Sequence, residues 1–515
     1  MPRSLFARIA FVLLVCAALP GCAAGLYDVD KDESTAIGPD NGTSLARAAD
    51  AWQRDNPGLS GFLPISRGSA ALGTRLAMIE AAELSVDAQY FIMKDDTSGA
   101  LFASALVDAA QRDVRIRLLL DDLATDVKDA NLYLLDMHPN IEVRIFNPVG
   151  RGGIYFANLI GHFKRANRRM HNKTFVVDGR YGIVGGRNIG DEYFELMGNK
   201  EFVDFDMLFV GDVARQTSLT FDRFWNHELS VPMSAYAERF SEDKLERERR
   251  RARAAMEDAV ASAYRDVRGE SILDAVLDET IDLQTGTAQV ITDDPEKLLT
   301  KAGTDYRYVI SELTRVLDEA EKEVLIVTPY LVPGENGLAY LEALRQRGVR
   351  VTILTNSLAS NNHIPVHGAY QRYRKPLLRA GVELYEVRST AAPEYTDLGV
   401  VGDSAIEALS MHTKGILIDR RYIFAGSLNV DPRAIDVNTE VGVLIESESL
   451  GRLLAETADE RIAAVAYRLS LDEKGRLAWE AKIGDEVVLR TSDPDAGAWR
   501  RFLAWASKIL PEKQL

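Results

Sequence analysis

The feature that most limits the fold of this chain is a short pattern that occurs twice, as MHNKTFVVDG over residues 170–179 and as MHTKGILIDR over residues 411–420. In each copy a lysine follows a histidine by two residues, and an aspartate follows the same histidine by seven. The two histidines, His171 and His412, are 241 residues apart in a chain of 515 residues. A motif repeated at almost half the chain length indicates a duplicated unit.

The segments around the two copies also correspond. Residues 84–93 and 322–332 are rich in β-branched and aromatic side chains, which predicts a strand in each half. Each is followed by a helical pattern and then by short apolar strands. Tyr90 and Tyr330 precede their motif histidines by 81 and 82 residues, so we take them as equivalent. This alternation of strands and helices predicts an α/β fold with mostly parallel sheets covered by helices.

Each motif is followed by a short segment that begins with small residues and ends in asparagine, GGRN in the first copy and GSLN in the second. Asn188 and Asn429 both stand 17 residues after their histidine. The intervening residues read as strand, turn and strand, and Asp178 and Asp419 are expected to brace this hairpin rather than touch a substrate. A lone strand histidine is more often structural, but two copies in register favour a functional site.

Pseudo-two-fold packing of the copies would bring two imidazoles, two ammonium groups and two amides to one centre. An anion with several oxygens, such as a phosphodiester, suits charge-assisted hydrogen bonds from Lys173 and Lys414. One histidine can attack phosphorus while the other protonates the departing oxygen. Metal binding competes for the histidines, but the lysines would repel a cation, so we expect neither a metal nor a cofactor.

The overall charge limits the partners of the chain. The formal net charge is −16 and the sequence pI is near 5.1. Nucleic acid normally requires a basic surface, so no nucleic-acid partner is expected. Both cysteines, Cys16 and Cys22, fall within the first 22 residues, which excludes a disulfide framework.

The first residues read as an export signal. Residues 1–21 combine Arg3 and Arg8 with an apolar run too short for a comfortable membrane span. The LPGC sequence that ends at Cys22 resembles the bacterial lipoprotein box, which predicts lipidation of this cysteine, with an uncleaved anchor as the alternative. The body would then face the periplasm of a bacterial envelope, and Ala23 favours the outer membrane.

The chain is expected to divide into a signal peptide 1–21, a tether 22–48, a first repeat 49–240, a charged helical connector 241–275, a second repeat 276–470 and a C-terminal segment 471–515. The tether is acidic and punctuated by glycine and proline. The C-terminal segment carries an apolar stripe with Trp499 and Phe502 among basic residues. Core packing and contact with a membrane both remain open for this stripe.

Two H-x-K-x4-D motifs, each followed by G[GS]xN, are the mark of the phospholipase D superfamily. The stretches VGGRNIGDEYF and NVDPRAIDVNTEVGVLIES further resemble bacterial cardiolipin synthases, most closely the C-type, from about residue 49 onward. The resemblance implies two phospholipase D-like α/β/α repeats, packed by pseudo-two-fold symmetry around one active site. The first copy departs from the G-S-x-N pattern at Gly186, where a hydroxyl is missing.

The resemblance also implies a role for each motif residue. His171 would be the nucleophile and His412 the general acid that later activates the acceptor. The phosphoryl oxygens would be bound by Lys173, Lys414, Asn188 and Asn429. Glu440 and either Asp204 or Asp206 would orient the imidazoles, and which acid serves which histidine stays open. His363 and His367 would line the acceptor pocket.

The function implied is phosphatidyl transfer that makes cardiolipin through a phosphohistidine intermediate. The donor would be phosphatidylethanolamine or phosphatidylglycerol, and the acceptor phosphatidylglycerol. A hydrolytic phospholipase D or phosphodiesterase is the alternative, and acidity disfavours a nuclease. A non-enzymatic lipid-binding scaffold is disfavoured by the intact histidines, lysines and asparagines. Phospholipids are thus the expected partners, and the resemblance leaves room for an accessory protein.

Overall fold

The computed structural model describes residues 27, 29–38, 42–123, 125–149, 163–197, 200–255, 261–300, 306–391, 408–510 and 512. The predicted signal peptide and Cys22 lie outside these residues. Within the ranges given, no helix is both long enough and apolar enough to cross a bilayer.

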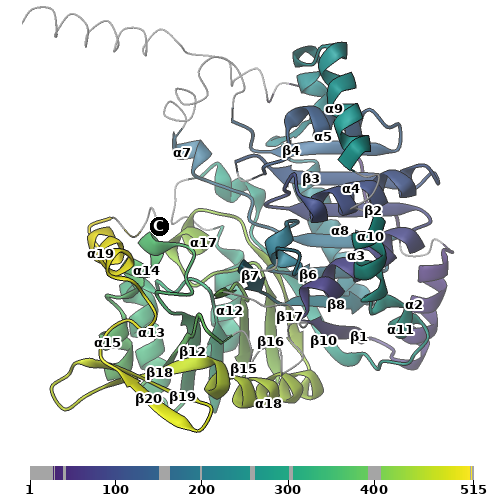
Figure 1. Cartoon of the computed structure of the whole chain (residues 1–515). Coiled ribbons are helices and arrows are strands. Elements are labelled where there is room, and N and C mark those ends of the chain that lie inside the picture. The colour runs from purple at the N-terminus through teal and green to yellow at the C-terminus, as the bar shows by residue number, and fades with distance from the viewer. Residues whose placement is uncertain are drawn as a thin grey trace, which may run out of the picture.

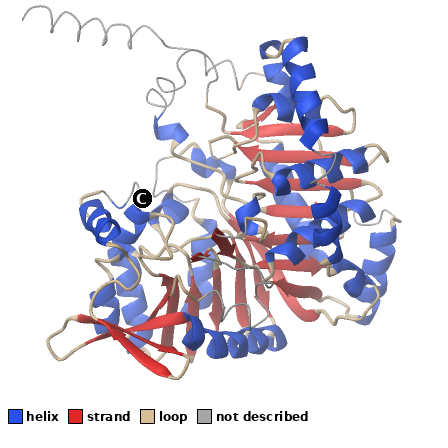
Figure 2. Ribbon diagram, in the orientation of Figure 1, coloured by secondary structure: helices blue, strands red, loops and turns tan. Residues whose placement is uncertain are grey.

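The strands fall into two matching sets, one in each half of the chain (Figures 1 and 2). The first half contains β1 (Ser60–Ile65), β2 (Ser85–Tyr90), β3 (Arg115–Asp121), β4 (Ile141–Phe146), β5 (Thr174–Val177), β6 (Tyr181–Gly185), β7 (Lys200–Val203), β8 (Asp206–Val210) and β9 (Ser230–Pro232). The second contains β10 (Gln284–Thr292), β11 (Glu323–Val327), β12 (Arg350–Asn356), β13 (Glu383–Val387), β14 (Ala408–Met411), β15 (Gly415–Ile418), β16 (Tyr422–Gly426), β17 (Val441–Glu446), β18 (Ala466–Leu471), β19 (Leu477–Ile483) and β20 (Glu486–Arg490).

Hydrogen-bonded neighbours show the duplication directly. The first sheet runs β9-β4-β3-β2-β5-β6-β8-β1, and the second runs β18-β13-β12-β11-β15-β16-β17-β10, with β19 and β20 added beyond β18. The edge strands β1 and β10 pair antiparallel and join the sheets. The predicted α/β architecture of two equivalent repeats is therefore confirmed.

The expectation of mostly parallel sheets was wrong. Within the two large sheets of the described residues, only β2–β3–β4 and β11–β12–β13 pair in parallel, and the other pairings are antiparallel. The reason lies in the connections, because parallel neighbours need a long crossover whereas a tight turn reverses the chain. The motif strands β5 and β15 turn directly into β6 and β16.

Helices cover the sheets. The first half contains α2 (Ser44–Asp55), α3 (Gly68–Ala81), α4 (Thr97–Ala110), α5 (Asp129–Asp136), α7 (Phe163–Ala166), α8 (Asp212–Trp225), α9 (Glu242–Ala255), α10 (Ala261–Gly269) and α11 (Leu273–Leu277). The second contains α12 (Tyr308–Asp318), α13 (Gly334–Gln346), α14 (Ile364–Tyr370), α15 (Arg374–Arg379), α17 (Pro432–Asp436), α18 (Glu448–Val465) and α19 (Ala498–Ser507). Short 3₁₀ helices span η2 (Asp191–Tyr193), η3 (Met233–Arg239) and η5 (Pro295–Leu298).

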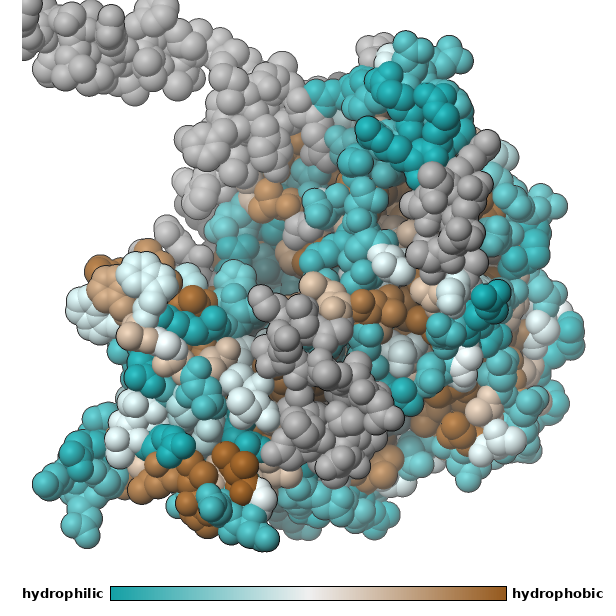
Figure 3. Space-filling view, viewed as in Figure 1, coloured by the Kyte–Doolittle hydropathy of each residue, from teal (hydrophilic) through white to brown (hydrophobic). Residues whose placement is uncertain are grey.

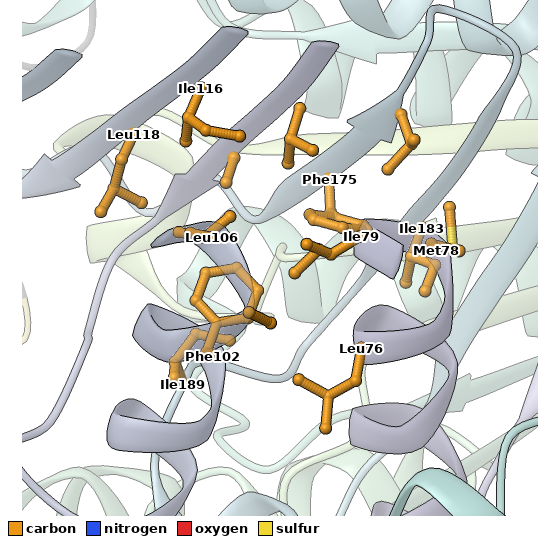
Figure 4. Packing of buried hydrophobic residues seen from close by; sticks show 14 of the residues in the cluster. Leu76, Met78, Ile79, Phe102, Leu106, Ile116, Leu118, Phe175, Ile183 and Ile189 are labelled. Atoms are coloured by element: carbon orange, nitrogen blue, oxygen red, sulfur yellow. The ribbon is translucent and has the colours of Figure 1, made fainter. Parts of the chain in front are cut away.

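The core of the first repeat lies between α3, α4 and its sheet. Phe102 and Leu106 of α4 pack towards Ile116 and Leu118 of β3, and all four side chains are buried (Figure 4). Helix α4 starts where it does because the Asp96 carboxylate accepts the N–H of Gly99 at 3.0 Å as an N-cap. This packing holds β2 in place, and the first site residues follow β2.

A separate apolar cluster joins the repeats. It brings Phe62 and Phe209 of the first repeat into one buried cluster with Ile423 and Val443 of the second. Because the interface is apolar and closed, the two sheets are held in a fixed relation.

Part of the predicted tether is packed on the first repeat. The N–H of Ala36 donates to Asp222 Oδ2 at 2.9 Å, and Lys31 Nζ donates to the Ser230 carbonyl at 2.8 Å. In the predicted connector, helices α9 and α10 pack against α5 and α3. The arginines of α9 are partly neutralised within the helix, as in the 2.6 Å bond from Arg251 to Glu248.

Candidate active site

The two motif histidines are held in equivalent ways, each by the backbone of the opposite repeat. The N–H of His171 donates to the Thr439 carbonyl at 3.0 Å, and the N–H of His412 donates to the Val203 carbonyl at 2.7 Å. Strand β14, which ends just before His412, also pairs with β7, which ends at Val203. Each histidine is thus fixed to a segment whose next residue is an acid of the other repeat.

Those acids reach the imidazoles across the boundary between the repeats. His171 Nδ1 lies 2.9 Å from Glu440 Oε2, and His412 Nδ1 lies 2.7 Å from Asp204 Oδ2. The question that the sequence left open is therefore answered by a crossed arrangement. With Nδ1–H directed at a carboxylate, Nε2 retains the lone pair for attack or for proton transfer.

Asp206, the alternative to Asp204, has a different partner. Its carboxylate forms a buried ion pair with Arg75 at 2.9 Å, and Arg187 lies 3.4 Å away. The two acids are only two residues apart in the chain, so only the fold distinguishes them.

The two motif lysines lie beside their own histidines in both copies. Lys173 Nζ donates to the His171 carbonyl at 2.6 Å, and Lys414 Nζ donates to the His412 carbonyl at 2.5 Å. Lys414 Nζ also stands 3.2 Å from His412 Nε2. The charges of both lysines act on both imidazoles, so these four groups form one cluster.

Burial and mutual repulsion both disfavour the positively charged forms of the two histidines and the two lysines. Burial, reinforced by the lysine charges, holds the pKa of His171 well below its ordinary value and lowers that of His412 to about 3. Burial likewise lowers the pKa of Lys173 to about 7 and that of Lys414 to about 8. An anion placed between the lysines would relieve the repulsion and restore their charge.

These shifts predict a pH dependence of anion binding. Lys173 and Lys414 lose their protons as the pH rises through 7 to 8, well below the range of an ordinary lysine. Affinity for a soluble phosphonate monoester, whose single charge is constant over this range, should fall by at least about tenfold between pH 6.5 and 9. Inhibition constants measured across this range test the prediction. A constant value would show that the lysines remain charged.

The acids differ in their surroundings. Burial raises the pKa of Glu440 to about 8, although Lys173 opposes this, and the Ser427 hydroxyl donates to Glu440 Oε2 at 2.5 Å. Asp204 is also buried, yet Lys414 and His412 hold its pKa below the ordinary value.

The departure from the motif at Gly186 has a steric cause. A Cβ at Gly186 would stand 2.4 Å from Asp204 Oδ1, so the carboxylate fills the space of a side chain. In the second copy the equivalent Ser427 fits because Glu440 approaches through a longer side chain and accepts its hydroxyl. The pairs Gly186 with Asp204 and Ser427 with Glu440 are thus two solutions to one packing requirement.

We expect Gly186→Ser to displace Asp204 and misorient His412. Activity should fall about 10- to 100-fold, as for loss of an outer-shell partner, with stability reduced by about 1–3 kcal/mol from overpacking. Turnover and thermal unfolding of the variant measure the two effects. Ser427→Gly serves as the matched variant, because it removes a donor without adding atoms. Full activity of Gly186→Ser would contradict this account.

The two motif asparagines stand in different settings. Asn188 Oδ1 accepts the N–H of Ile92 at 3.1 Å, and its amide donates to the Tyr193 hydroxyl at 2.8 Å. The Tyr193 ring in turn meets the His412 ring edge-on at 5.4 Å. Asn429 is buried, and its Oδ1 has no hydrogen-bond partner among the described residues.

The motif aspartates lie at the far end of their strands, away from the histidines. Asp178 accepts the N–H groups of the three residues 83–85 at 3.1, 2.9 and 2.8 Å. Asp419 accepts those of residues 321–323, each at 2.8 Å. Each aspartate ties the motif hairpin to the start of the neighbouring strand, β2 or β11. Bracing, rather than contact with substrate, is the role that these bonds support.

Aromatic residues that the sequence analysis did not single out complete the walls of the active site. The Phe91 ring stands 4.9 Å from the His171 ring and beneath the Lys173 ammonium, at 5.2 Å. Phe202 stacks on His412 at 5.2 Å. Phe91 directly follows β2, and Phe202 precedes Asp204 by two residues. The sequence signal that could have identified them is their position, directly after a strand for Phe91 and close to a site acid for Phe202.

The proposed equivalence of Tyr90 and Tyr330 was wrong by two residues. The bridges Met93–Ile189 and Leu331–Val430 are equivalent, which aligns Tyr330 with Ile92. Tyr90 is buried and accepts a hydrogen bond from Arg75 at 3.0 Å, whereas the Tyr330 ring lies 6.4 Å from that of His412.

Of the two further histidines, only one lies near the cluster. The His363 ring stands 5.6 Å from that of Tyr330, on the His412 side. His367 is buried and lies 2.8 Å from an Arg374 nitrogen, and burial lowers its pKa to about 4. The expectation that His367 lines the acceptor pocket was wrong, because it belongs to an internal ion-pair network.

Two histidines with crossed carboxylates and two lysines, built on duplicated α/β repeats, define an enzyme of the phospholipase D superfamily. Residues 76–225 and 313–462 match the family model described as "Cardiolipin synthase, PLD-like domain". These matches span more than half of the chain, and the chain belongs to this family of phosphatidyltransferases.

Similar proteins agree with this assignment. The chain is 37% identical to cardiolipin synthase C of Escherichia coli, over 92% of this chain and 99% of that protein. It is 32% identical to an uncharacterized protein of Helicobacter pylori, over 90% and 91% of the two chains. The crystal structure of phosphatidylserine synthase from Haemophilus influenzae superposes with a TM-score of 0.55 at 13% identity, over 82% and 92%. That last likeness shows the fold alone.

Proposed function

We propose that the enzyme makes cardiolipin by phosphatidyl transfer through a phosphatidyl group bound to His171. The donor is phosphatidylethanolamine or phosphatidylglycerol, and the acceptor is the free hydroxyl of phosphatidylglycerol. The observation that carries the proposal is the crossed pair of His–carboxylate contacts around two buried lysines. A cationic, partly desolvated cluster of this kind stabilises a phosphoryl group as charge builds up on it.

In the first step, Nε2 of His171 attacks phosphorus while the phosphoryl oxygens accept hydrogen bonds from Lys173 and Lys414. The bond from phosphorus to the headgroup oxygen breaks, and that oxygen takes a proton from His412. The anionic substrate raises the low pKa of His412, and Asp204 stabilises the resulting imidazolium.

In the second step, His412 accepts the proton of the incoming phosphatidylglycerol hydroxyl. The alkoxide oxygen bonds to phosphorus, the bond from phosphorus to His171 Nε2 breaks, and cardiolipin leaves. Water in place of this hydroxyl would give phosphatidic acid, which is the hydrolytic alternative. Transfer therefore depends on a site that admits the lipid alcohol in preference to water.

An apolar groove supports a lipid substrate. A cavity of about 540 Å³ lies between α4, α5 and α9, and Met93 and Lys94, which follow Phe91 of the site, are among the residues that line it. Its apolar lining includes Ala100, Ala103, Val107, Leu134 and Leu135. Such a lining suits an acyl chain and gives no advantage to a nucleic acid.

The test is mass spectrometry of the products formed in vesicles of phosphatidylethanolamine and phosphatidylglycerol. We expect cardiolipin, with released ethanolamine or glycerol identifying the donor. Phosphatidic acid alone would establish the hydrolytic alternative. No product from a folded enzyme, with His171→Ala as the blank, would overturn the proposal.

We further propose that lipidation of Cys22 anchors the enzyme on the periplasmic side of the envelope, in the outer membrane. The composition of residues 1–23 supports this. Labelled palmitate should enter the wild-type chain and not Cys22→Ser, and density-gradient separation of the membranes identifies the membrane concerned. Equal labelling of both chains would refute the anchor.

A further inference from the structure

Helix α19 turns its aromatic side chains away from the protein. Trp499, Phe502 and Trp505 are 70%, 49% and 63% exposed, and Ile509 just beyond the helix is 85% exposed. The three rings form a continuous row, in which Trp499 stacks on Phe502 with centroids 5.4 Å apart and Phe502 meets Trp505 in a tilted contact at 5.9 Å. In Figure 3, brown and pale side chains gather over this helix at the left of the view. Core packing, the ordinary explanation for an apolar stripe, does not apply to these residues.

The opposite face of α19 is firmly docked. Ala504 is fully buried, and its carbonyl lies only 2.4 Å from the position of a Cβ at Gly368 of α14. Arg500 Nε donates to the Leu358 carbonyl at 2.6 Å, and Arg372 donates to the Lys508 carbonyl at 2.6 Å. The exposure of the aromatic face is therefore fixed by specific contacts on its reverse side.

This helix stands beside the His412 side of the active site. Its partner α14 follows directly after His363, whose ring contacts Tyr330 at 5.6 Å, and Tyr330 in turn contacts His412. The Tyr330 hydroxyl also donates to Asn362 Oδ1 at 2.8 Å, within the loop that Arg500 holds. Figure 1 shows α14, α17 and α19 together at one end of the second repeat.

We propose that the exposed face of α19 docks into the headgroup region of a bilayer and seats the His412 side of the active site on the membrane surface. Tryptophan and phenylalanine favour this depth, where an apolar ring meets acyl chains and headgroups together. The cations of Arg501 and Lys508 lie on the same helix or just beyond it and suit anionic headgroups. A second copy of the chain is the competing occupant. The proposal deepens the proposed function by naming the route by which lipid substrates reach the site.

The first test needs no turnover, so its failure is distinct from failure of the proposed function. The full chain is reconstituted in vesicles that contain phosphatidylcholine brominated near the top of its acyl chains. Tryptophan fluorescence should be quenched relative to ordinary vesicles. The quenching should be lost in Trp499→Phe/Trp505→Phe, because Trp225 and Trp479 are buried in the protein and Trp52 of α2 packs, partly buried, against the core of the first repeat. Equal fluorescence of the wild-type chain in both vesicles would overturn the proposal.

The second test measures the contribution to catalysis. Trp499→Ser/Phe502→Ser/Trp505→Ser should lower the rate on vesicles about tenfold relative to the rate on a soluble short-chain substrate. The matched control is Val487→Ser/Leu489→Ser on β20, which removes exposed apolar side chains elsewhere on the second repeat and should leave this ratio unchanged. Concentration-dependent dimerisation that the triple substitution abolishes, without quenching by brominated lipid, would assign the face to a second copy and refute the proposal.

Discussion

His171→Ala should abolish phosphatidyl transfer, with a loss on the order of 10⁵-fold in kcat, because the nucleophile of a covalent mechanism has no substitute in this site. No phosphatidyl adduct should form on the enzyme, and intact-protein mass spectrometry after rapid quenching detects such an adduct directly. The variant should remain folded, since the buried imidazole carries a desolvation cost that alanine does not.

Two controls sharpen this prediction. His138→Ala, in the loop after α5, should behave as the wild type. His412→Ala should be strongly impaired on phospholipids but should still form the adduct from a soluble p-nitrophenyl phosphodiester, whose leaving group needs no general acid. If His412→Ala blocked adduct formation from this substrate and His171→Ala did not, the two roles would have to be exchanged.

The crossed carboxylates predict a second large effect. Glu440→Gln should lower activity on the order of 10³-fold, because the amide no longer selects the imidazole tautomer that leaves Nε2 of His171 free to attack. Asp204→Asn should cause a comparable loss through His412. The two variants should nevertheless fail at different steps.

With the p-nitrophenyl substrate, Asp204→Asn should retain a burst of p-nitrophenol and Glu440→Gln should not. Glu440→Gln should also add nothing further in a His171→Ala background, since residues that act as a unit are not additive. Rapid-mixing kinetics measure both properties. The reverse burst pattern would mean that each acid serves the histidine of its own repeat, contrary to the geometry.

Sequence reasoning succeeded where chemistry is local. The spacing of His, Lys and Asp within ten residues predicted a hairpin with a bracing aspartate, and Asp178 and Asp419 accept the backbone bonds that bracing requires. Such features depend on strand geometry and turn residues, which a short segment carries by itself. The same reasoning erred by two residues for Tyr90, because insertions between repeats are invisible in a single sequence.

The direction of each strand and the identity of its neighbours in the sheet were harder to predict from the sequence. An apolar strand has the same pattern whether its neighbour is parallel or antiparallel, so the mixed character of both sheets appeared only in the fold. The aromatic stripe of α19 presented the same difficulty, because periodicity identifies an apolar face without identifying what covers it.

The sequence by itself determined that this protein is a duplicated enzyme with two His-Lys-Asn sets, since both copies can be read within short windows. Only the tertiary structure decided that Glu440 serves His171 and that Asp204, not Asp206, serves His412. It also showed why Gly186 must lack a side chain beside Asp204. The physical reason is that these contacts join residues more than 200 positions apart, or depend on free space of less than one methyl group. Neither the direction of approach nor the available volume is encoded in any local pattern.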